Sequence, residues 1–458
     1  MRNILNNAAF IEKNLLYYIL YMSIIISVGT FLTGCGNTTN NTTITDTTNS
    51  SADSSTNNSN TISTDNTAIS TDNNSSNISN SYNLKDSFIT GVDVSSIISL
   101  EESGVVFYDE NNNKCDIFKL LADNGVTCIR VRIFNDPYDE NHNSYGGGHN
   151  DLATALAIGK RASSYNIPLY VDFHYSDFWA DPSKQQVPKA WSNMSLLEKK
   201  QAIYDYTVNC LNQFIENNIK IKLVQIGNET NYNFCGETSW DNICTLLSSG
   251  IKAVRDVAAS NNLSLETVLH FTNPEISDNY STIAAALDQH NVDYDVFATS
   301  YYPYWHGTLK NLNNVLSSIS ANYNKKVLVA ETAYPYTLDD TDYFTNNVNR
   351  DNYKDITYDI SPAGQRTYIE ALTQTLCTIP NSIGFFYWEP AWITVGNSYE
   401  ENFKKWEKYG SGWATSFSGS YDPDDAGKYY GGSSWDNQAL FDFSGKPLPS
   451  LSIFKDIR

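Results

Sequence analysis

Eight short runs rich in β-branched and aromatic residues alternate with longer amphipathic segments from about residue 85 to the C-terminus. The runs occupy residues 88–96, 127–134, 167–175, 222–229, 267–275, 295–304, 326–334 and 382–390. Between them lie segments such as 151–165 and 195–218, where apolar residues recur at spacings of three and four. Strand–helix alternation predicts a parallel sheet, and eight such units predict an α/β fold of the (β/α)8 barrel type with long βα loops. We therefore expect residues 85–458 to form one domain.

The N-terminal part of the chain has the character of targeting and linker sequence. Basic residues precede an apolar stretch at 15–32, and the sequence LTGC, ending at Cys35, resembles a bacterial lipoprotein box. We predict a signal peptide over residues 1–34 and lipid attachment to Cys35; the alternative is an uncleaved signal anchor, for which the apolar stretch is slightly short. Residues 35–84 are dominated by Asn, Thr, Ser and Asp, which predicts a disordered stalk. Either alternative places the rest of the chain outside the cytoplasm, tethered to a membrane.

The charge balance restricts the partners of this chain. The formal net charge is −21, and an acidic surface repels phosphate backbones, so we expect no nucleic-acid partner. No glycine-rich phosphate-binding motif follows a strand, so nucleotide binding has no support. No heptad or other association motif is present, which favours a monomer.

Six cysteines follow Cys35, and export permits disulfides among them. Their pairing stays open, because six cysteines allow fifteen full pairings. Cys128 lies inside an apolar run, where a buried free thiol is the plainer expectation.

Most of the eight runs end in polar or aromatic residues. In a barrel of parallel strands the C-terminal strand ends and the loops that follow them form one face, where the chemistry is placed. Glu229 ends the fourth run and Glu331 ends the seventh. These two positions lie across the mouth of an eight-stranded barrel from each other, so a pair of carboxyl groups is predicted there.

A pair of carboxyl groups at one site suits glycoside hydrolysis. One carboxylic acid protonates the leaving oxygen, and the other, ionised, attacks the anomeric carbon; a separation of about 5–5.5 Å gives retention of configuration. We assign Glu229 as the acid and then the base, and Glu331 as the nucleophile. Arg132 and Tyr302 are the expected donors that keep Glu331 ionised. The alternative is that each glutamate is a structural carboxylate bound by backbone donors or a salt bridge.

Other strand-end residues are candidates for contact with a sugar. Asn228, next to Glu229, is expected to hold the sugar's 2-hydroxyl, a contact that strengthens in the transition state. Trp388 could stack on the sugar at the cleavage point or fill the core. His174 could contact substrate or be a satisfied structural histidine.

The chain from 88 to 456 resembles glycoside hydrolase family 53, the arabinogalactan endo-β-1,4-galactanases in the clan of retaining (β/α)8 enzymes. The matching stretches include GVDVSSIISLEESG, IRVRIFNDPYD, VDFHYSDFWADPSKQ, VQIGNETN, YDVFATSYYPYWHGTLKNL, VAETAYPY and YDPDDAGKYYGGS. The resemblance implies that Glu229 is the proton donor and Glu331 the nucleophile. It also implies that the substrate is the β-1,4-galactan of pectin side chains.

The resemblance implies two further sets of residues on the long loops. Segments 181–184 and 421–428 match family loops that bind galactosyl units at a distance from the cleavage point. The resemblance therefore implies substrate contacts by Asp181, Lys184, Tyr421 and Asp425. Some bacterial relatives hold a calcium ion between the loops after strands seven and eight, and the corresponding residues are Asp340, Asp342, Asn346, Ser433 and Asp436. Phe344, which cannot coordinate a cation, stands where relatives have a further ligand, so a solvated acidic loop without calcium is the alternative.

Two other functions remain open from the sequence. A different retaining glycosidase of the same architecture, such as a xylanase or a mannanase, would also carry two strand-end glutamates. A non-catalytic glycan-binding lipoprotein would have the same N-terminal features, although the presence of both glutamates argues against it.

Overall fold

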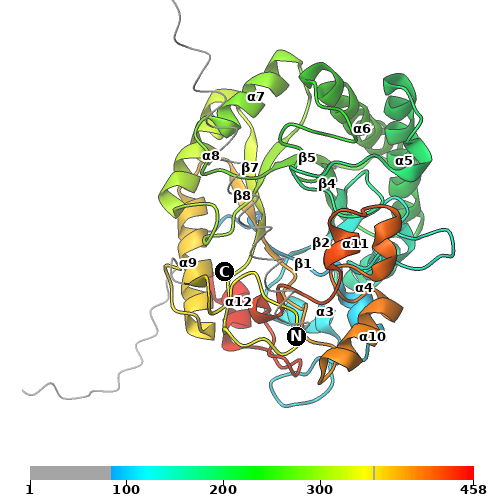
Figure 1. Cartoon of the computed structure of the whole chain (residues 1–458). Helices are drawn as coiled ribbons and strands as arrows, with labels where there is room; N and C mark the ends of the chain where they lie inside the picture. The colour runs from blue at the N-terminus through cyan, green and yellow to red at the C-terminus, as the bar shows by residue number, and fades with distance from the viewer. Residues whose placement is uncertain (1–83, 354–355) are drawn as a thin grey trace, which may run out of the picture. The chain divides into compact units, whose positions relative to one another are not determined.

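The eight predicted strands form a closed parallel barrel (Figure 1). The structure is a computed structural model that describes residues 84–353 and 356–458. Each strand pairs with the next in sequence, and β8 closes the barrel against β1. The prediction of a (β/α)8 barrel is therefore confirmed. The strands are β1 (Ile89–Asp93), β2 (Cys128–Ile133), β3 (Leu169–Phe173), β4 (Ile221–Ile226), β5 (Glu266–Phe271), β6 (Val296–Ser300), β7 (Lys326–Thr332) and β8 (Ser382–Trp388).

Helices surround the barrel, and their ends follow sequence signals (Figure 1). The predicted segment 151–165 forms α4, and the Asp151 side chain caps its first turn by accepting from the backbone N–H of Thr154. The segment 195–218 forms α5, which begins with a reciprocal capping box between Ser195 and Glu198. The helices are α2 (Ile97–Glu102), α3 (Ile117–Asp123), α4 (Leu152–Ser164), α5 (Leu196–Glu216), α6 (Trp240–Asn261), α7 (Asn279–Gln289), α8 (Leu309–Tyr323), α9 (Pro362–Cys377), α10 (Tyr399–Tyr409), α11 (Ala426–Tyr429) and α12 (Ile453–Asp456), with 3-10 turns η1 (Lys189–Trp191), η3 (Ser416–Ser420), η4 (Asp436–Gln438) and η5 (Pro449–Ser452).

The inside of the barrel changes from apolar to polar along the strands. Side chains of alternate strand residues point inward, and the first inward positions form one buried apolar cluster that includes Cys128, Tyr170 and Leu223. Two residues further along β2 and β3, the inward positions are the fully buried Arg130 and Asp172. The barrel is thus sealed at one end by apolar packing, and polar groups collect toward the C-terminal ends of the strands, as expected for this fold.

An irregularity in β7 turns Glu331 into the barrel. Leu328 and Ala330 both belong to the inner apolar cluster, so strict alternation would point residue 331 outward. The register between β6 and β7 shifts, however, and Ser300 pairs with Glu331 instead of with Ala330. Thr332 now faces outward, where its hydroxyl bonds to Tyr368 on α9. A β-bulge of this kind re-aims a side chain, and here it places a carboxylate at the mouth.

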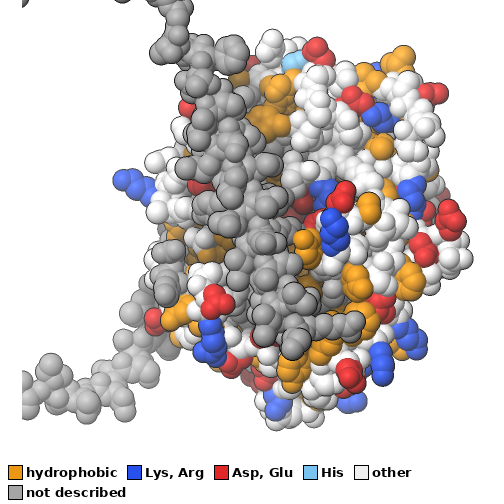
Figure 2. Space-filling model, viewed as in Figure 1, with side chains coloured by type: hydrophobic (Ala, Val, Ile, Leu, Met, Phe, Trp, Pro, Cys, Tyr) orange, Lys and Arg blue, Asp and Glu red, His pale blue; other side chains and the backbone are white. Residues whose placement is uncertain are grey.

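Several other expectations can be compared with the described residues. Within 84–353 and 356–458 none of the six cysteines is paired, and Cys128 is a buried free thiol as predicted. On the face seen in Figure 2, acidic and basic side chains are interspersed, and the basic ones form no continuous patch. None of the described helices is long and apolar enough to span a membrane. The predicted signal peptide, Cys35 and nearly all of the stalk lie outside the described residues.

Candidate active site

Glu331 is held by two donors at the end of β7. Arg130 Nη1 donates to Oε1 over 2.8 Å, and the Tyr302 hydroxyl donates to Oε2 over 3.0 Å. The glutamate is only 8% exposed. Burial raises the pKa of Glu331, and the positive charge of Arg130 opposes that rise. Both carboxylate oxygens therefore have a charged or polar donor, as a nucleophilic carboxylate requires.

Glu229 lies in a tight turn that follows β4. Gly227 begins the turn with a φ of 79°, and a Cβ there would lie 2.4 Å from the side chain of Thr230, so only glycine fits. Glu229 itself has a φ of 49°, an uncommon backbone conformation for a residue with a side chain. Its Oε1 is hydrogen-bonded to the hydroxyl of Ser300 over 2.6 Å. Burial, and next the charge of Glu331, raise the pKa of Glu229 to about 8.

The two glutamates therefore differ in a way that separates their chemistry. Glu331 is paired with a guanidinium and a phenol, which favour its ionised form. Glu229 is bonded to a neutral hydroxyl, and its environment favours the protonated form at neutral pH. Glu229, whose pKa is raised to about 8, suits the acid role, and Glu331, with a cation and a hydroxyl bonded to its oxygens, suits the nucleophile role.

The prediction that Arg132 on β2 contacts Glu331 was wrong: the contact is made from the previous inward position of that strand. Arg130, not Arg132, reaches Glu331, and it also pairs with Asp93 and Asp172. Arg132 instead pairs with Glu389 over 2.6 Å. Both arginines point inward, but Arg130 lies deeper along β2, level with the carboxylate that the bulge in β7 brings in. The prediction of Tyr302 as the second donor is confirmed.

Asn228 is fixed by contacts on both sides of its amide. Its nitrogen donates to the carbonyl of Ala180, and its oxygen accepts from Arg130 and Gln225. These partners determine which end of the amide is oxygen and which is nitrogen. The same oxygen lies 2.8 Å from Nδ1 of His270.

A chain of inward residues that the sequence analysis did not single out joins Asn228 to Glu229. His270 on β5 contacts Asn228 with Nδ1 and Ser300 with Nε2, and Ser300 contacts Glu229. Gln225 on β4 also lies next to His270. The period-two alternation of β4 and β5 was the available signal, because it places residues 225 and 270 on the inner face.

His174 occupies a structural position. Its Nδ1 accepts from the backbone N–H of Ala180, and its Nε2 lies 3.2 Å from Asp172. Because both ring nitrogens have protein partners and the residue is 2% exposed, the geometry favours the structural alternative over direct contact with a sugar.

Trp388 belongs to an aromatic cluster at the mouth. Its ring lies 4.9 Å from that of Trp435, and Trp435 in turn contacts Tyr302 and Trp305. Trp305 is 47% exposed, so the cluster reaches the solvent there. Trp305 and Trp435 come from different loops, and nothing in the sequence indicated that they meet.

The two long loops expected to extend the site contact each other. Lys184, after β3, pairs with Asp422 and Asp425, after β8, over 2.6 and 3.0 Å. The hydroxyl of Tyr421 is buried among backbone groups of the first loop and the hydroxyl of Ser176. Asp181 bonds within its own loop to Ser183. Lys184, Tyr421 and Asp425 thus join the loops, whatever contact they also make with a ligand.

The predicted calcium ligands include a cluster of three carboxylates. One oxygen from each of Asp340, Asp342 and Asp436 lies within 4.8 Å of the others. Both carboxylate oxygens of Asp436 and both polar atoms of the Asn346 side chain are buried without a hydrogen-bond partner. Burial raises the pKa of Asp436 to about 8. Converging carboxylate oxygens, of which both in Asp436 are buried without a donor of hydrogen, suit a hard cation such as Ca2+.

Phe344 and Ser433 also contact this cluster of carboxylates. The backbone N–H groups of Phe344 and Ser433 each donate to Asp342. The phenyl ring of Phe344 packs against Trp406. Position 344 therefore supplies no side-chain ligand. The three carboxylates and Asn346 remain, and these residues fit a cation.

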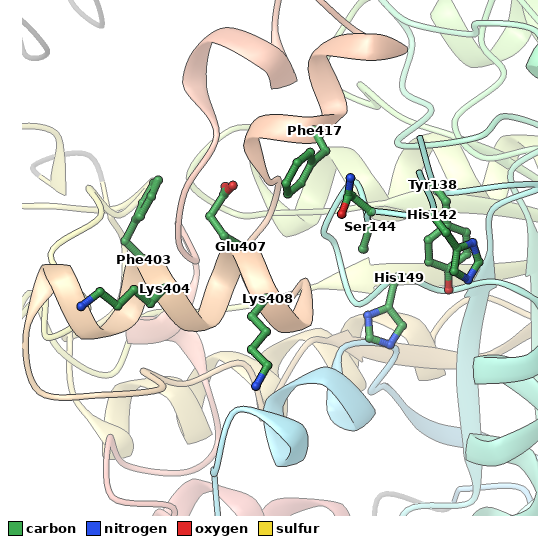
Figure 3. A pocket seen from close by; sticks show the side chains of 10 residues that line it. Tyr138, His142, Ser144, His149, Phe403, Lys404, Glu407, Lys408 and Phe417 are labelled. Carbon is green, nitrogen blue, oxygen red and sulfur yellow. The ribbon is translucent and has the colours of Figure 1, made fainter. Parts of the chain in front are cut away.

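A separate hollow lies between α10 and the loop that follows β2 (Figure 3). It is open to solvent and has a volume of about 600 Å3, and Tyr138, His149 and Phe403 are among the residues that line it. Neither Glu229 nor Glu331 lines this hollow. It is therefore distinct from the paired glutamates, which lie at the ends of β4 and β7.

Comparisons with known proteins agree with this geometry. Residues 89–454 match the family described as Glycosyl hydrolase family 53. The chain is 51% identical over 375 residues to an endo-beta-1,4-galactanase of Bacillus subtilis (strain 168), covering 81% of this chain and 86% of that protein. It is 33% identical over 380 residues to an arabinogalactan endo-beta-1,4-galactanase of Cellvibrio japonicus, covering 80% of this chain and 90% of that protein.

A solved structure of a related protein has the same fold as this chain. The catalytic domain of an Ignisphaera aggregans protein of this family matches with a TM-score of 0.72 and 38% identity, covering 82% of this chain and 97% of that domain. The resemblance noted in the sequence is thereby confirmed. The chain belongs to glycosyl hydrolase family 53.

Proposed function

We propose that this chain is an endo-acting β-1,4-galactanase that cleaves galactan and type I arabinogalactan with retention of configuration. The observation that carries the proposal is the unequal environment of the two glutamates: Glu331 is bonded to the guanidinium of Arg130 and to Tyr302, whereas Glu229 is bonded to the neutral hydroxyl of Ser300. The names of the relatives from Bacillus subtilis and Cellvibrio japonicus support the substrate.

In the first step, the protonated Glu229 gives its proton to the glycosidic oxygen while the Glu331 carboxylate attacks the anomeric carbon. The glycosidic bond breaks, and a galactosyl ester of Glu331 forms. In the second step, the ionised Glu229 takes a proton from water, and that water attacks the anomeric carbon and releases Glu331. Each glutamate returns to its starting state, and the two displacements together retain the configuration.

Asn228 and the aromatic cluster would hold the sugar. The amide nitrogen of Asn228 carries a second hydrogen besides the one given to Ala180, and we assign it to the 2-hydroxyl of the sugar. Trp388 and the exposed Trp305 offer apolar faces for galactosyl rings. Asp181, Lys184, Tyr421 and Asp425 would contact units farther along the chain.

Substitution of the two glutamates tests the activity. Glu331→Gln should abolish reducing-sugar release from linear galactan, and Glu229→Gln should lower it by about 10²–10⁴-fold, the usual contribution of a general acid. Glu216→Gln, at an exposed position at the end of α5, is the matched control and should leave the rate unchanged. Full turnover by Glu331→Gln, or equal activity of the wild type on galactan and on xylan or mannan, would refute the proposal.

A calcium ion is proposed as a structural partner of Asp340, Asp342, Asn346, Ser433 and Asp436. The ion would neutralise the converging carboxylates and tie the loop after β7 to the loop after β8. It would take no part in bond cleavage.

The location of the enzyme is also a proposal. The sequence around Cys35 supports export and anchoring of a monomer to a membrane by a lipid on that thiol. Metabolic labelling with a radioactive fatty acid should mark the wild-type chain and not Cys35→Ser. Equal labelling of both would refute the lipid site, and no labelling of either would favour the uncleaved anchor.

A further inference from the structure

We propose that His270, acting through Ser300, is a positioning residue whose tautomer follows the proton on Glu229. This inference rests on the proposed role of Glu229 as acid and base. It concerns a chain of four side chains from two strands and one turn: Asn228, His270, Ser300 and Glu229. All four lie at the C-terminal end of the barrel, and His270 and Ser300 are fully buried.

The direction of each hydrogen bond follows from the partners at the Asn228 end. The amide nitrogen of Asn228 donates to Ala180, so the atom that faces His270 is the oxygen. A carbonyl oxygen only accepts, and it lies 2.8 Å from Nδ1. Nδ1 of His270 must therefore carry a hydrogen for this contact to be favourable.

The charge of His270 decides what its other nitrogen does. Burial, and next the positive charge of Arg130, hold the pKa of His270 well below its usual value, so the ring is neutral and carries a single N–H. With that hydrogen on Nδ1, Nε2 has a lone pair and accepts from the hydroxyl of Ser300, 3.0 Å away. Asp172 and His174 are the other titratable groups that face this ring.

Ser300 has one hydrogen and two neighbours that can accept it. If it donates to His270, its oxygen can only accept from Glu229, 2.6 Å away. That contact is a hydrogen bond only when Oε1 of Glu229 carries the proton. The chain from Glu229 to Asn228 is thus complete for the protonated acid, the form that begins the proposed reaction.

Ionisation of Glu229 reverses the direction of the hydrogen bonds between Glu229, Ser300 and His270. The carboxylate then needs the hydrogen of Ser300, whose oxygen in turn accepts from Nε2 of His270. The hydrogen of the ring moves from Nδ1 to Nε2 with no net change in charge. Nδ1 then accepts from Gln225 Nε2, 3.2 Å away, which redirects to it the hydrogen that it otherwise gives to the oxygen of Asn228. The cost of this form is the contact of two lone pairs between Nδ1 and the oxygen of Asn228. That cost reduces, without cancelling, the stabilisation that the hydrogen bond from Ser300 gives to the carboxylate of Glu229. Burial and the charge of Glu331 raise the pKa of Glu229, and the bond from Ser300 lowers it.

The pH profile of kcat/KM for galactan should fall on its alkaline side as Glu229 loses its proton. Two substitutions should shift this alkaline limb in opposite directions. His270→Asn keeps a nitrogen that donates to Asn228 and removes the acceptor at Nε2, so Ser300 is free to bond the carboxylate; the limb should move to lower pH by about one unit. Ser300→Ala removes the donor to the carboxylate, so the limb should move to higher pH by about one unit. His290→Asn, at the end of α7, is the control and should leave the limb unchanged.

Nitrogen-15 NMR of histidine-labelled protein tests the tautomer without any substrate. In the wild type the His270 signals should report Nδ1–H below about pH 8 and a growing share of Nε2–H above it, whereas in Glu229→Gln the Nδ1–H form should persist. Shifts of the two activity limbs in the same direction, or an unchanged tautomer across this pH range, would overturn the inference. Absence of galactan cleavage by the wild type would instead refute the proposed function, and the NMR result would still test the relay.

Discussion

Arg130 on β2 and Glu331 near the end of β7 form an ion pair over 2.8 Å, inside the barrel and almost out of contact with water. The same guanidinium pairs with Asp93 over 3.0 Å and with Asp172 over 2.8 Å. One cation therefore serves three carboxylates, and it opposes the effect of burial on the pKa of Glu331. The ionised state of the proposed nucleophile depends on this single residue more than on any loop contact.

Arg130→Lys should move the acidic limb of kcat/KM to higher pH. Lysine keeps the charge but cannot bond Glu331, Asp172 and Asn228 at once, so the pKa of Glu331 should rise further. Activity needs the ionised form, and it is lost as the pH falls through that pKa. The measurement is the pH profile on galactan.

The matched control for this change is Arg161→Lys on α4, where the arginine pairs with Glu101 and Asp116 at a partly exposed position. Its acidic limb should equal that of the wild type. Arg130→Met should lower the free energy of unfolding by about 3–5 kcal/mol, because it leaves buried carboxylates without a cation. An unshifted acidic limb in folded Arg130→Lys would contradict the assignment of Arg130.

Stability should fall with rising pH in a way that depends on Glu229. Its pKa is raised from the ordinary value of 4.5 to about 8, so the folded state holds this proton more tightly than the unfolded state does. The resulting contribution to stability is present below about pH 4.5 and is lost as the pH rises to about 8. Glu229→Gln should therefore lose less stability than the wild type over this window, measured by denaturant unfolding at several pH values.

The wild type and Glu229→Gln have to be compared directly, because Asp436 and Glu389 also have raised pKa values and contribute in both proteins. Parallel pH dependences of the two proteins would mean that Glu229 is not protonated at neutral pH.

Calcium should raise the melting temperature of the full chain by a few degrees relative to protein in EGTA, because an ion that binds only the folded state stabilises it. Asp436→Asn should remove most of this difference, since both oxygens of Asp436 are buried without another partner. Asp351→Asn, at an exposed acid of the loop after β7 that also carries Asp340 and Asp342, should retain it. Equal melting temperatures of the wild type with calcium and with EGTA would refute the calcium proposal.

The sequence predicted the barrel well because each strand is a local pattern. Six of the eight runs contain an observed strand, and the other two strands, β4 and β5, begin one residue before their runs. The helices on either side of β3 begin at the caps Asp151 and Ser195. Local propensity and the closed sheet agree at these positions, so short segments carried enough information. The two glutamates followed from the rule that polar strand ends meet at one face of such a barrel.

The partner of Glu331 could not be predicted in the same way. Alternation alone points residue 331 away from the barrel, and only the shift between Thr299 and Ser300 brings it inside. Whether Arg130 or Arg132 reaches it depends on the stagger of β2 against β7, which is a property of the whole barrel. The meeting of Trp305 with Trp435 likewise depends on two loops that are far apart in the sequence.

The roles of Glu229 and Glu331 are tested most directly by azide rescue of their alanine variants on an aryl β-galactobioside. Azide should enter from the side of the missing group, so Glu229→Ala should release the β-galactobiosyl azide and Glu331→Ala the α-galactobiosyl azide. The opposite pairing of variant and anomer, or the same anomer from both variants, would contradict the account.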